Sequence, residues 1–193
     1  MSILRTTEGS QSNVLHSGQW KDDKVNGSGT ITFSKGSKLT AVFNNGAITS
    51  GDYTWTDNNG TYKMHVDNST SKPVYTLEAN YSNGVSYKGS FSNGNLNGQG
   101  TMIYPNTGIY TGGFVNGKKS GAGGFVWNDG DKFSGTWAND QMNGQGLYTF
   151  ANGSTLSGPF KSNVPQGTLT YTYQGKAYKT AWSSGKCTSI TKA

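Results

Sequence analysis

Short segments of alternating apolar and polar residues run along most of the 193-residue chain, and glycine-rich turns separate them. Tyr87, Gly89 and Phe91 occupy alternate positions, with Lys88 and Ser90 between them. Residues two apart in a strand share a face, so this alternation predicts a half-buried β-strand. Nine Asn-Gly dipeptides and one Asp-Gly mark the reversals. Asn-Gly is the strongest short hairpin signal because both residues tolerate positive φ.

These segments recur at an interval of 23 residues over most of the chain. The motif aromatic-x-Gly-x-aromatic begins at Tyr87 and returns at Tyr110 and Phe133. A second signal follows in most units, where a Gly-x-Gly pair precedes another aromatic residue. These second aromatics are Phe33, Tyr104, Trp127, Phe150 and Tyr173. Such self-similarity predicts a repeat array in which each unit contacts mainly its neighbours.

The full pattern, with its paired aromatics, short turn and Gly-x-Gly, resembles the MORN repeat family. The resemblance covers residues 16–182, about seven units and a final strand. The units that begin at Leu39 and Tyr62 depart from it, because Ala41 and Met64 replace the motif glycine. The resemblance implies an elongated, twisted single-sheet ribbon that serves as a scaffold or a membrane-proximal adaptor, with self-association through the end of the array.

We therefore expect an all-β protein, an open antiparallel meander of repeated β-hairpins. Residues 1–15 are expected to form an N-terminal cap or a degenerate half-repeat, residues 16–182 the array, and residues 183–193 a polar basic tail. Helices are not expected, because glycine recurs every few residues. The glycine between two aromatics is expected to leave room for a neighbouring ring to lie over bare backbone.

The composition narrows the class of protein further. Hydrophobic residues make up only 32% of the chain, but 12% is aromatic and 13% charged, which is not the composition of a disordered chain. No apolar run is long enough for a transmembrane helix or a signal-peptide core. One Cys and two His are too few for an internal disulfide or a structural zinc site. We expect no cofactor, and a cytoplasmic or membrane-peripheral location is favoured.

Candidate catalytic groups are few. Neither His16 nor His65 has a Ser or Cys partner at a repeated position. Residues 112–119 nearly match a P-loop, but Lys119 stands where Ser or Thr must hold magnesium, and no helix is predicted to follow. We therefore predict no catalytic residues, no metal site and no enzymatic activity.

The aromatic residues lead to the main functional hypothesis, a non-enzymatic module whose aromatic groove and sheet edges bind a protein partner or a second copy of the chain. A homodimer through the C-terminal repeat edge is one form of this hypothesis. The predicted partner-binding residues are Tyr87, Phe91, Tyr104, Tyr110, Phe114, Trp127, Phe133, Trp137 and Trp182.

The net charge of +6 is concentrated toward the C-terminus, where no acid follows Asp140. Lysines at this end either guard a sheet edge against open-ended pairing or attract an anionic partner. Arg5 is the only arginine, which argues against specific recognition of nucleic acid. The residues predicted to bind an anionic partner are Lys118, Lys119, Lys161, Lys176, Lys179 and Lys186.

Two alternative functions stay open. The first is peripheral binding to acidic phospholipids through the basic C-terminal end, which the family resemblance also suggests. The second is binding of carbohydrate or cell wall on the aromatic face, because flat rings stack on sugars and short Trp- and Gly-rich hairpin repeats resemble bacterial wall-binding modules.

Overall fold

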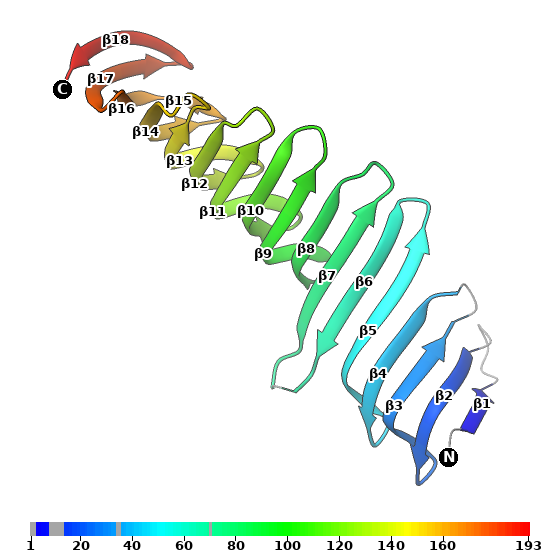
Figure 1. Cartoon of the computed structure of the whole chain (residues 1–193). Helices are drawn as coiled ribbons and strands as arrows, with labels where there is room; N and C mark the ends of the chain where they lie inside the picture. The colour runs from blue at the N-terminus through cyan, green and yellow to red at the C-terminus, as the bar shows by residue number, and fades with distance from the viewer. Residues whose placement is uncertain (1–2, 8–13, 34–35, 70) are drawn as a thin grey trace. The chain divides into compact units, whose positions relative to one another are not determined.

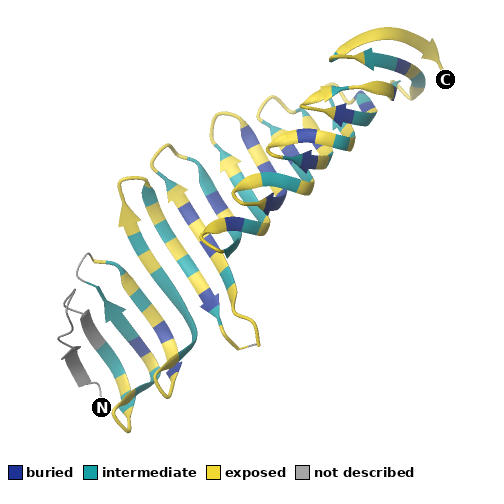
Figure 2. Cartoon of the chain, turned by 180° about the vertical axis from the view of Figure 1, so that it is seen from behind, coloured by how far each residue is buried: buried dark blue, intermediate teal, exposed yellow. Residues whose placement is uncertain are grey.

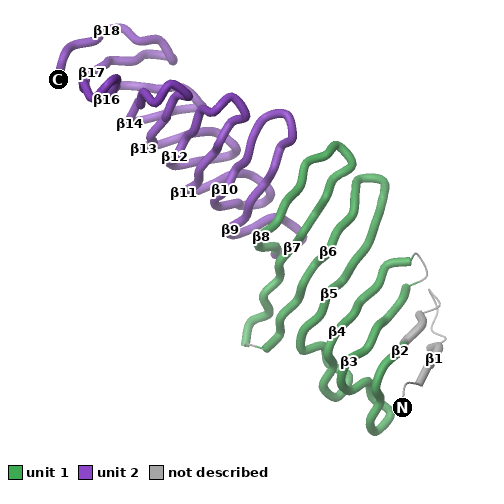
Figure 3. Tube along the Cα trace, viewed as in Figure 1, with its two compact units in different colours: residues 1–91 green, residues 92–193 purple. Residues whose placement is uncertain are grey.

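The computed structural model describes residues 3–7, 14–33, 36–69 and 71–193, and the side chains of these from residue 17 onward. Every regular element in these ranges is a β-strand (Figure 1), so the predicted all-β meander of hairpins is confirmed. Within the same ranges no helix has the length and apolar character needed to cross a bilayer. The chain divides into two compact units, residues 1–91 and 92–193 (Figure 3).

Unit 1 is a meander in which each strand pairs antiparallel with the next one along the chain. Its longest strand has 11 residues, and eight residue pairs join each adjacent two of its three central strands. The strands are β1 (Ile3–Thr7), β2 (Val14–Lys21), β3 (Lys24–Thr32), β4 (Lys38–Asn44), β5 (Ala47–Asp57), β6 (Gly60–Asp67), β7 (Val74–Tyr81) and β8 (Ser86–Ser92).

Unit 2 continues the same plan with one irregularity, since a two-residue strand and its successor both pair with β14. The strands are β9 (Asn95–Tyr104), β10 (Gly108–Val115), β11 (Lys118–Trp127), β12 (Lys132–Ala138), β13 (Gln141–Thr149), β14 (Thr155–Lys161), β15 (Val164–Pro165), β16 (Gly167–Tyr173), β17 (Lys176–Ser183) and β18 (Lys186–Lys192).

Two-residue turns with positive φ join many of the hairpins. Asn116 (φ 49°) and Gly117 (φ 80°) have the conformation that the Asn-Gly signal predicts. Three of the described turns achieve it without glycine, and two of these have Asp140 (φ 69°) and Asn163 (φ 70°) as their second residues. A side-chain oxygen of each accepts a backbone N–H from the hairpin before it, Lys119 N–H at 2.9 Å and Met142 N–H at 2.8 Å. These bonds link consecutive hairpins at their turn ends.

The motif glycine coincides with a bulge. The register between β10 and β11 shifts between Gly112 and Phe114, and the register between β12 and β13 shifts between Gly135 and Trp137. A bulge bends its strand and increases the local twist. The strands of unit 2 are accordingly curved, and buried and exposed positions alternate along them (Figure 2). We call the face with the buried residues the inner face and the opposite one the outer face.

Aromatic rings fill the inner face of unit 2. Phe133 is 1% exposed and makes edge-to-face contacts with Trp137, at 5.5 Å between ring centroids, and with Phe160, at 5.1 Å. A Cβ atom at Gly135 would lie 2.7 Å from Cζ of Phe133 and 2.6 Å from the carbonyl oxygen of Gln145. The expectation that a ring lies over bare glycine backbone is thus confirmed.

Unit 1 has a thinner inner face. Its buried residues include Ala41 and Ala79, at 4% and 1% exposure, beside larger side chains such as Phe43 and Leu77. Ala41 stands at the position of the motif glycine, and its Cβ leaves no room for a ring over the backbone. Smaller residues therefore replace the stacked rings of unit 2 here.

The two ends of the chain compare differently with expectation, and only the C-terminal end departs from it. In the predicted cap, residues 1–2 and 8–13 lie outside the described residues, and the described part holds β1, which pairs with β2. Residues 183–193 were expected to be a polar tail beyond the array. They contain β18, which pairs with β17 from Tyr178 to Ser183, so the sheet extends past residue 182.

Candidate interaction surfaces

Five of the nine predicted partner-binding aromatics belong to the core. Their exposed fractions run from 0% for Tyr110 to 4% for Trp137. The Tyr110 hydroxyl donates to the carbonyl oxygen of Gly113 at 3.0 Å, and Trp137 Nε1 donates to that of Gly123 at 3.0 Å. The four rings of unit 2 contact one another edge to face, and all five are buried, so they stabilise the sheet and offer little contact surface. The five are Tyr87, Tyr110, Phe114, Phe133 and Trp137.

Other aromatics of unit 2 form a continuous line of ring contacts at the end of the strands opposite the two-residue turns. Successive centroids are 6.0, 4.6, 5.5 and 4.9 Å apart. All but Phe125 are partly exposed. Two of them, Tyr104 and Trp127, were predicted to bind a partner. We call this set the aromatic row; its members are Tyr104, Phe125, Trp127, Tyr148 and Phe150.

A carboxylate holds one ring of the aromatic row in place. The Tyr148 hydroxyl donates to Oδ2 of Asp131 at 2.6 Å, and the other oxygen of Asp131 accepts the backbone N–H of Ala151 at 2.8 Å. Burial raises the pKa of Tyr148 above its ordinary value, and the bond to Asp131 raises the pKa further. Tyr148 therefore stays protonated and oriented at any physiological pH.

Unit 1 carries a second line of rings that the sequence analysis missed. Trp55 and Tyr62 are stacked with centroids 4.8 Å apart and planes inclined by 14°, and Tyr53 and Tyr81 extend the line. All four are partly exposed. The missing motif glycines in these units hid the signal. The alternation of Tyr53, Trp55 and Asp57 along one strand would have revealed it.

The two remaining predicted aromatics, Phe91 and Trp182, are partly exposed. Trp182 Nε1 donates to Oγ1 of Thr180 at 2.8 Å, and that hydroxyl donates to the carbonyl oxygen of Leu169 at 2.9 Å. This chain of bonds joins β17 to the buried Leu169 on β16 and gives the last hairpins a polar element in their core.

Lys119 is the exception among the predicted anion-binding lysines. Its Nζ lies between 5.3 and 5.9 Å from the centroids of four rings, and 3.6 Å from Oδ1 of Asp140. Its side chain is 14% exposed. Leu96 and Met142, 23 residues before and after it, are buried apolar residues. Lys119 therefore replaces a core residue and is not available to an anionic partner. The four rings belong to Tyr104, Tyr110, Phe125 and Trp137.

The other predicted anion-binding lysines are exposed, on β11, β14, β17 and β18. Unit 2 has eight Lys and three Asp, a net charge of +5, whereas unit 1 has a net charge of +1. The three acids, Asp129, Asp131 and Asp140, lie between strands, so no strand of unit 2 carries a carboxylate. The exposed predicted residues are Lys118, Lys161, Lys176, Lys179 and Lys186.

The outer face of unit 2 has an aliphatic patch. Ile103, Ile109 and Val126 are cross-strand neighbours on β9, β10 and β11, and their exposed fractions are 43%, 43% and 45%. Lys132 follows opposite Val126 on β12. Three aliphatic side chains beside a lysine on an acid-free face can contact an apolar surface with negative charge around it.

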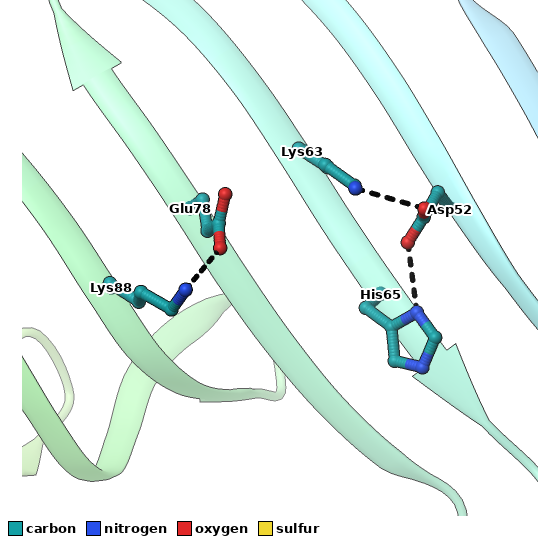
Figure 4. A network of polar contacts seen from close by, with 5 residues as sticks. All are labelled: Asp52, Lys63, His65, Glu78 and Lys88. Carbon is teal, nitrogen blue, oxygen red and sulfur yellow. Dashed lines mark hydrogen bonds and ion pairs between the residues drawn. The ribbon is translucent and has the colours of Figure 1, made fainter.

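The outer face of unit 1 carries instead a network of ionic contacts (Figure 4). Asp52 on β5 contacts Lys63 Nζ at 3.0 Å and His65 Nδ1 at 2.8 Å, both on β6. Glu78 on β7 contacts Lys88 Nζ on β8 at 2.6 Å. The four strands lie side by side, so the contacts run across the sheet.

These contacts lower the pKa values of the two carboxylates. Burial alone would raise the pKa of Asp52, but the hydrogen bonds from His65 and Lys63 lower it below its ordinary value. The bond from Lys88 lowers the pKa of Glu78. Both groups are therefore ionised at neutral pH. Among the described residues no cluster of three or more His, Cys, Asp or Glu is placed to hold a metal ion.

The model of the MORN repeat matches residues 16–38, 87–109, 110–132 and 133–155. The chain is a MORN-repeat protein. The predicted family is thereby confirmed, and three of the matched repeats are those with both aromatics and the motif glycine. MORN repeats are non-enzymatic modules that generally take part in protein and membrane interactions.

The matches leave a gap at residues 39–86, where the MORN motif loses its glycines and where most of the ionic network lies. No curated protein matches the chain. The two units in this gap keep the hairpin architecture, because β4–β8 pair in the same consecutive order as the rest.

Proposed function

We propose that this MORN-repeat protein is a non-enzymatic interaction module whose aromatic row binds an extended segment of a partner protein. The observation that carries the proposal is the line of five touching rings, four of them partly exposed. Tyr and Trp are the side chains that most often dominate protein interfaces, because each buries a large area at low entropic cost.

The row suits an extended segment. Its centroids are separated by 4.6–6.0 Å and its rings come from three strands, β9, β11 and β13, together with residue 150 just beyond β13. An extended chain advances about 3.3 Å per residue, so every second side chain of a partner could meet a new ring. Within the row, the buried Phe125 and the bond from Tyr148 to Asp131 hold the rings in place before binding.

A random-peptide display library provides the test. Peptides are selected on the wild-type protein and then screened against Trp127→Gln, with Thr136→Gln on the outer face as the matched control. We expect peptides that bind wild type and Thr136→Gln equally and bind Trp127→Gln at least tenfold more weakly. Peptides that bind all three proteins equally, or no enrichment at all, would refute the aromatic row as the site.

A second candidate function is peripheral binding to a membrane with acidic phospholipids. The outer face of unit 2, with its aliphatic patch and no carboxylate on its strands, supports it, as does the net charge of +5. Each lysine near an anionic leaflet contributes about 1 kcal/mol of attraction. The proposed membrane-binding surface includes Lys132 and Lys179 on the outer face, in addition to the basic C-terminal end.

Sedimentation with vesicles tests this candidate. We expect binding to vesicles of phosphatidylcholine and phosphatidylserine, none to phosphatidylcholine alone, and loss of binding in high salt. Charge reversal at Lys176, Lys179 and Lys186 should abolish it, whereas Lys24→Glu in unit 1 should not. Binding that survives the triple reversal would exclude the basic end as the site.

Self-association through the edge of β18 is opposed by its charges. All seven residues of β18 are exposed, and among the described strands it pairs only with β17. Full antiparallel pairing of two copies would place Lys186 opposite Lys192 at both ends, and like charges opposite one another destabilise a sheet. We therefore expect light scattering to give a monomer in low salt; a homodimer there would show that another surface associates.

A further inference from the structure

The outer face of unit 1 is hollowed where the ionic network lies. Two depressions of about 390 and 320 Å³ adjoin there, and both are bordered by Lys63 and Glu78. The first also includes Thr54 and Asn80, and the second includes His65 together with Asp52, Thr76 and Lys88. Volumes of this size match sites for small ligands, which typically occupy about 300–1,000 Å³. We call the combined depression the polar hollow.

The repeat does not require charged residues at this place. Lys63 and Lys88 occupy the second position of their units, where three repeats of unit 2 have Thr111, Ser134 and Ser157 and its final copy has Lys179. Their cross-strand neighbour Glu78 has its counterpart in Thr101, which pairs with Thr111. The hairpins fold with hydroxyl side chains here, so the charges of the polar hollow are additional to what the sheet needs.

The charges in the hollow balance. Asp52 and Glu78 are ionised, and they face Lys63 and Lys88. An ionic ligand would gain little from a site with no net charge, and it would have to displace one member of an existing pair. A ligand with hydroxyl groups meets neither obstacle.

Hydrogen-bonding capacity remains after the pairs have formed. A carboxylate can accept about four hydrogen bonds and an ammonium can donate three, so each pair leaves free acceptors and donors. Thr54, Thr56 and Thr61 add hydroxyls, and Asn80 adds an amide with both donors and an acceptor. Adjacent hydroxyls of a sugar are matched donors and acceptors of this kind.

We propose that the polar hollow binds an uncharged carbohydrate chain, with Thr54, Lys63, Glu78 and Asn80 as its contacts. The shared border at Lys63 and Glu78 makes the two depressions successive positions for one chain. The proposal goes beyond the protein-binding role of the aromatic row, because it concerns another unit and the outer face of the sheet. The two proposals can fail independently.

The test is a set of amide NMR titrations of the full chain. The probes are hexasaccharides of cellulose, starch, xylan and chitin, each up to about 10 mM, a range that detects Kd values in the millimolar region and below. We expect at least one of them to shift the backbone amides of residues 52–56, 61–65 and 76–80, and to leave the amides of unit 2 unchanged.

Two variants and a control locate the binding. Thr54→Val removes a hydroxyl without a change of shape, and Asn80→Ala removes the amide; each should weaken binding about tenfold, as expected for a lost hydrogen bond. Thr136→Val makes the same change on the outer face of unit 2 and should leave the affinity unchanged. The dispersion of the same spectra reports whether each variant is folded.

Three outcomes would overturn the proposal. One is the absence of shifts with all four hexasaccharides, which would leave the hollow as a solvated face. Another is a set of shifts confined to the aromatic row, which would move sugar binding to the inner face. The last is stronger binding of a Lys- and Glu-containing peptide than of any sugar, which would assign the hollow to a protein partner.

Discussion

Replacement of the motif glycine on β12, Gly135→Ala, tests whether bare backbone under the rings is what lets the core close. The new Cβ would lie 2.6 Å from two backbone atoms, the oxygen of Gln145 and the Cα of Gly146, and 2.7 Å from Cζ of Phe133. Real Cβ contacts are not this short. The neighbouring strand and the ring of Phe133 must both move, although that ring is fixed between Trp137 and Phe160.

The magnitude follows from two opposing effects. Overpacking a dense core costs about 1–3 kcal/mol, whereas alanine restricts the unfolded chain and contributes about 0.4–1 kcal/mol of stability. Gly135→Ala should therefore lower the free energy of unfolding by about 1–2 kcal/mol. The matched control is Gly124→Ala on the adjacent strand, where the nearest atom to a new Cβ is 3.5 Å away. It should be neutral or slightly stabilising.

Urea unfolding followed by tryptophan fluorescence measures the difference. With a slope of about 2 kcal/mol per molar urea, the midpoints of the two variants should be about 1 M apart. Phe133→Leu in the Gly135→Ala background should recover part of the loss, because a smaller side chain vacates the space above residue 135. Equal midpoints for Gly135→Ala and Gly124→Ala would refute the reasoning that ring-over-glycine packing limits this position.

Three further predictions concern titration and the core. Burial raises the pKa of Tyr87 and Tyr110 to about 12, above the unfolded value near 10. Their contribution to stability should therefore be complete below pH 10 and decline between pH 10 and 12, and each group contributes roughly 2–3 kcal/mol at most. Thermal melts followed by circular dichroism measure this decline, and Tyr110→Phe should reduce it. Lys119→Met should change the unfolding free energy by less than about 1 kcal/mol, because an apolar residue occupies the equivalent position in neighbouring repeats and replaces a partly buried ion pair. Lys118→Met is the control. A loss above about 3 kcal/mol would show that the ring-enclosed ammonium is essential. Asp131→Asn should lower the pKa of Tyr148, which ultraviolet titration of the phenol measures. An unchanged pKa would contradict the hydrogen bond between Tyr148 and Asp131.

The fold was predictable because its signals are local and repeated. The 23-residue interval, the Asn-Gly turns and the alternation at Tyr110 and Phe133 each specify hairpins without reference to distant residues. The bulge at Gly135 was not predictable in the same way, since it depends on how two strands meet. That bulge curves the sheet, and curvature decides which rings close into the core.

The candidate sites were less predictable than the fold. Tyr110 and Trp137 have the pattern of docking residues because a sequence does not tell an exposed aromatic face from one that closes on itself. Lys119 has the pattern of a surface charge, although its position between Leu96 and Met142 in the repeat frame indicates a core column. The segment that forms β18 resembles a tail because every one of its residues is exposed, so it has no apolar signal.

The bonds between consecutive turns bear on how such a protein can change length. Asp140 and Asn163 each tie one hairpin to the hairpin before it, and the pattern repeats with the unit. Removal of residues 110–132 would join two ends that occupy the same place in the repeat frame. Evolution can therefore lengthen or shorten this array by whole units, whereas the gain or loss of one residue inside a strand would turn its ring-bearing side toward water.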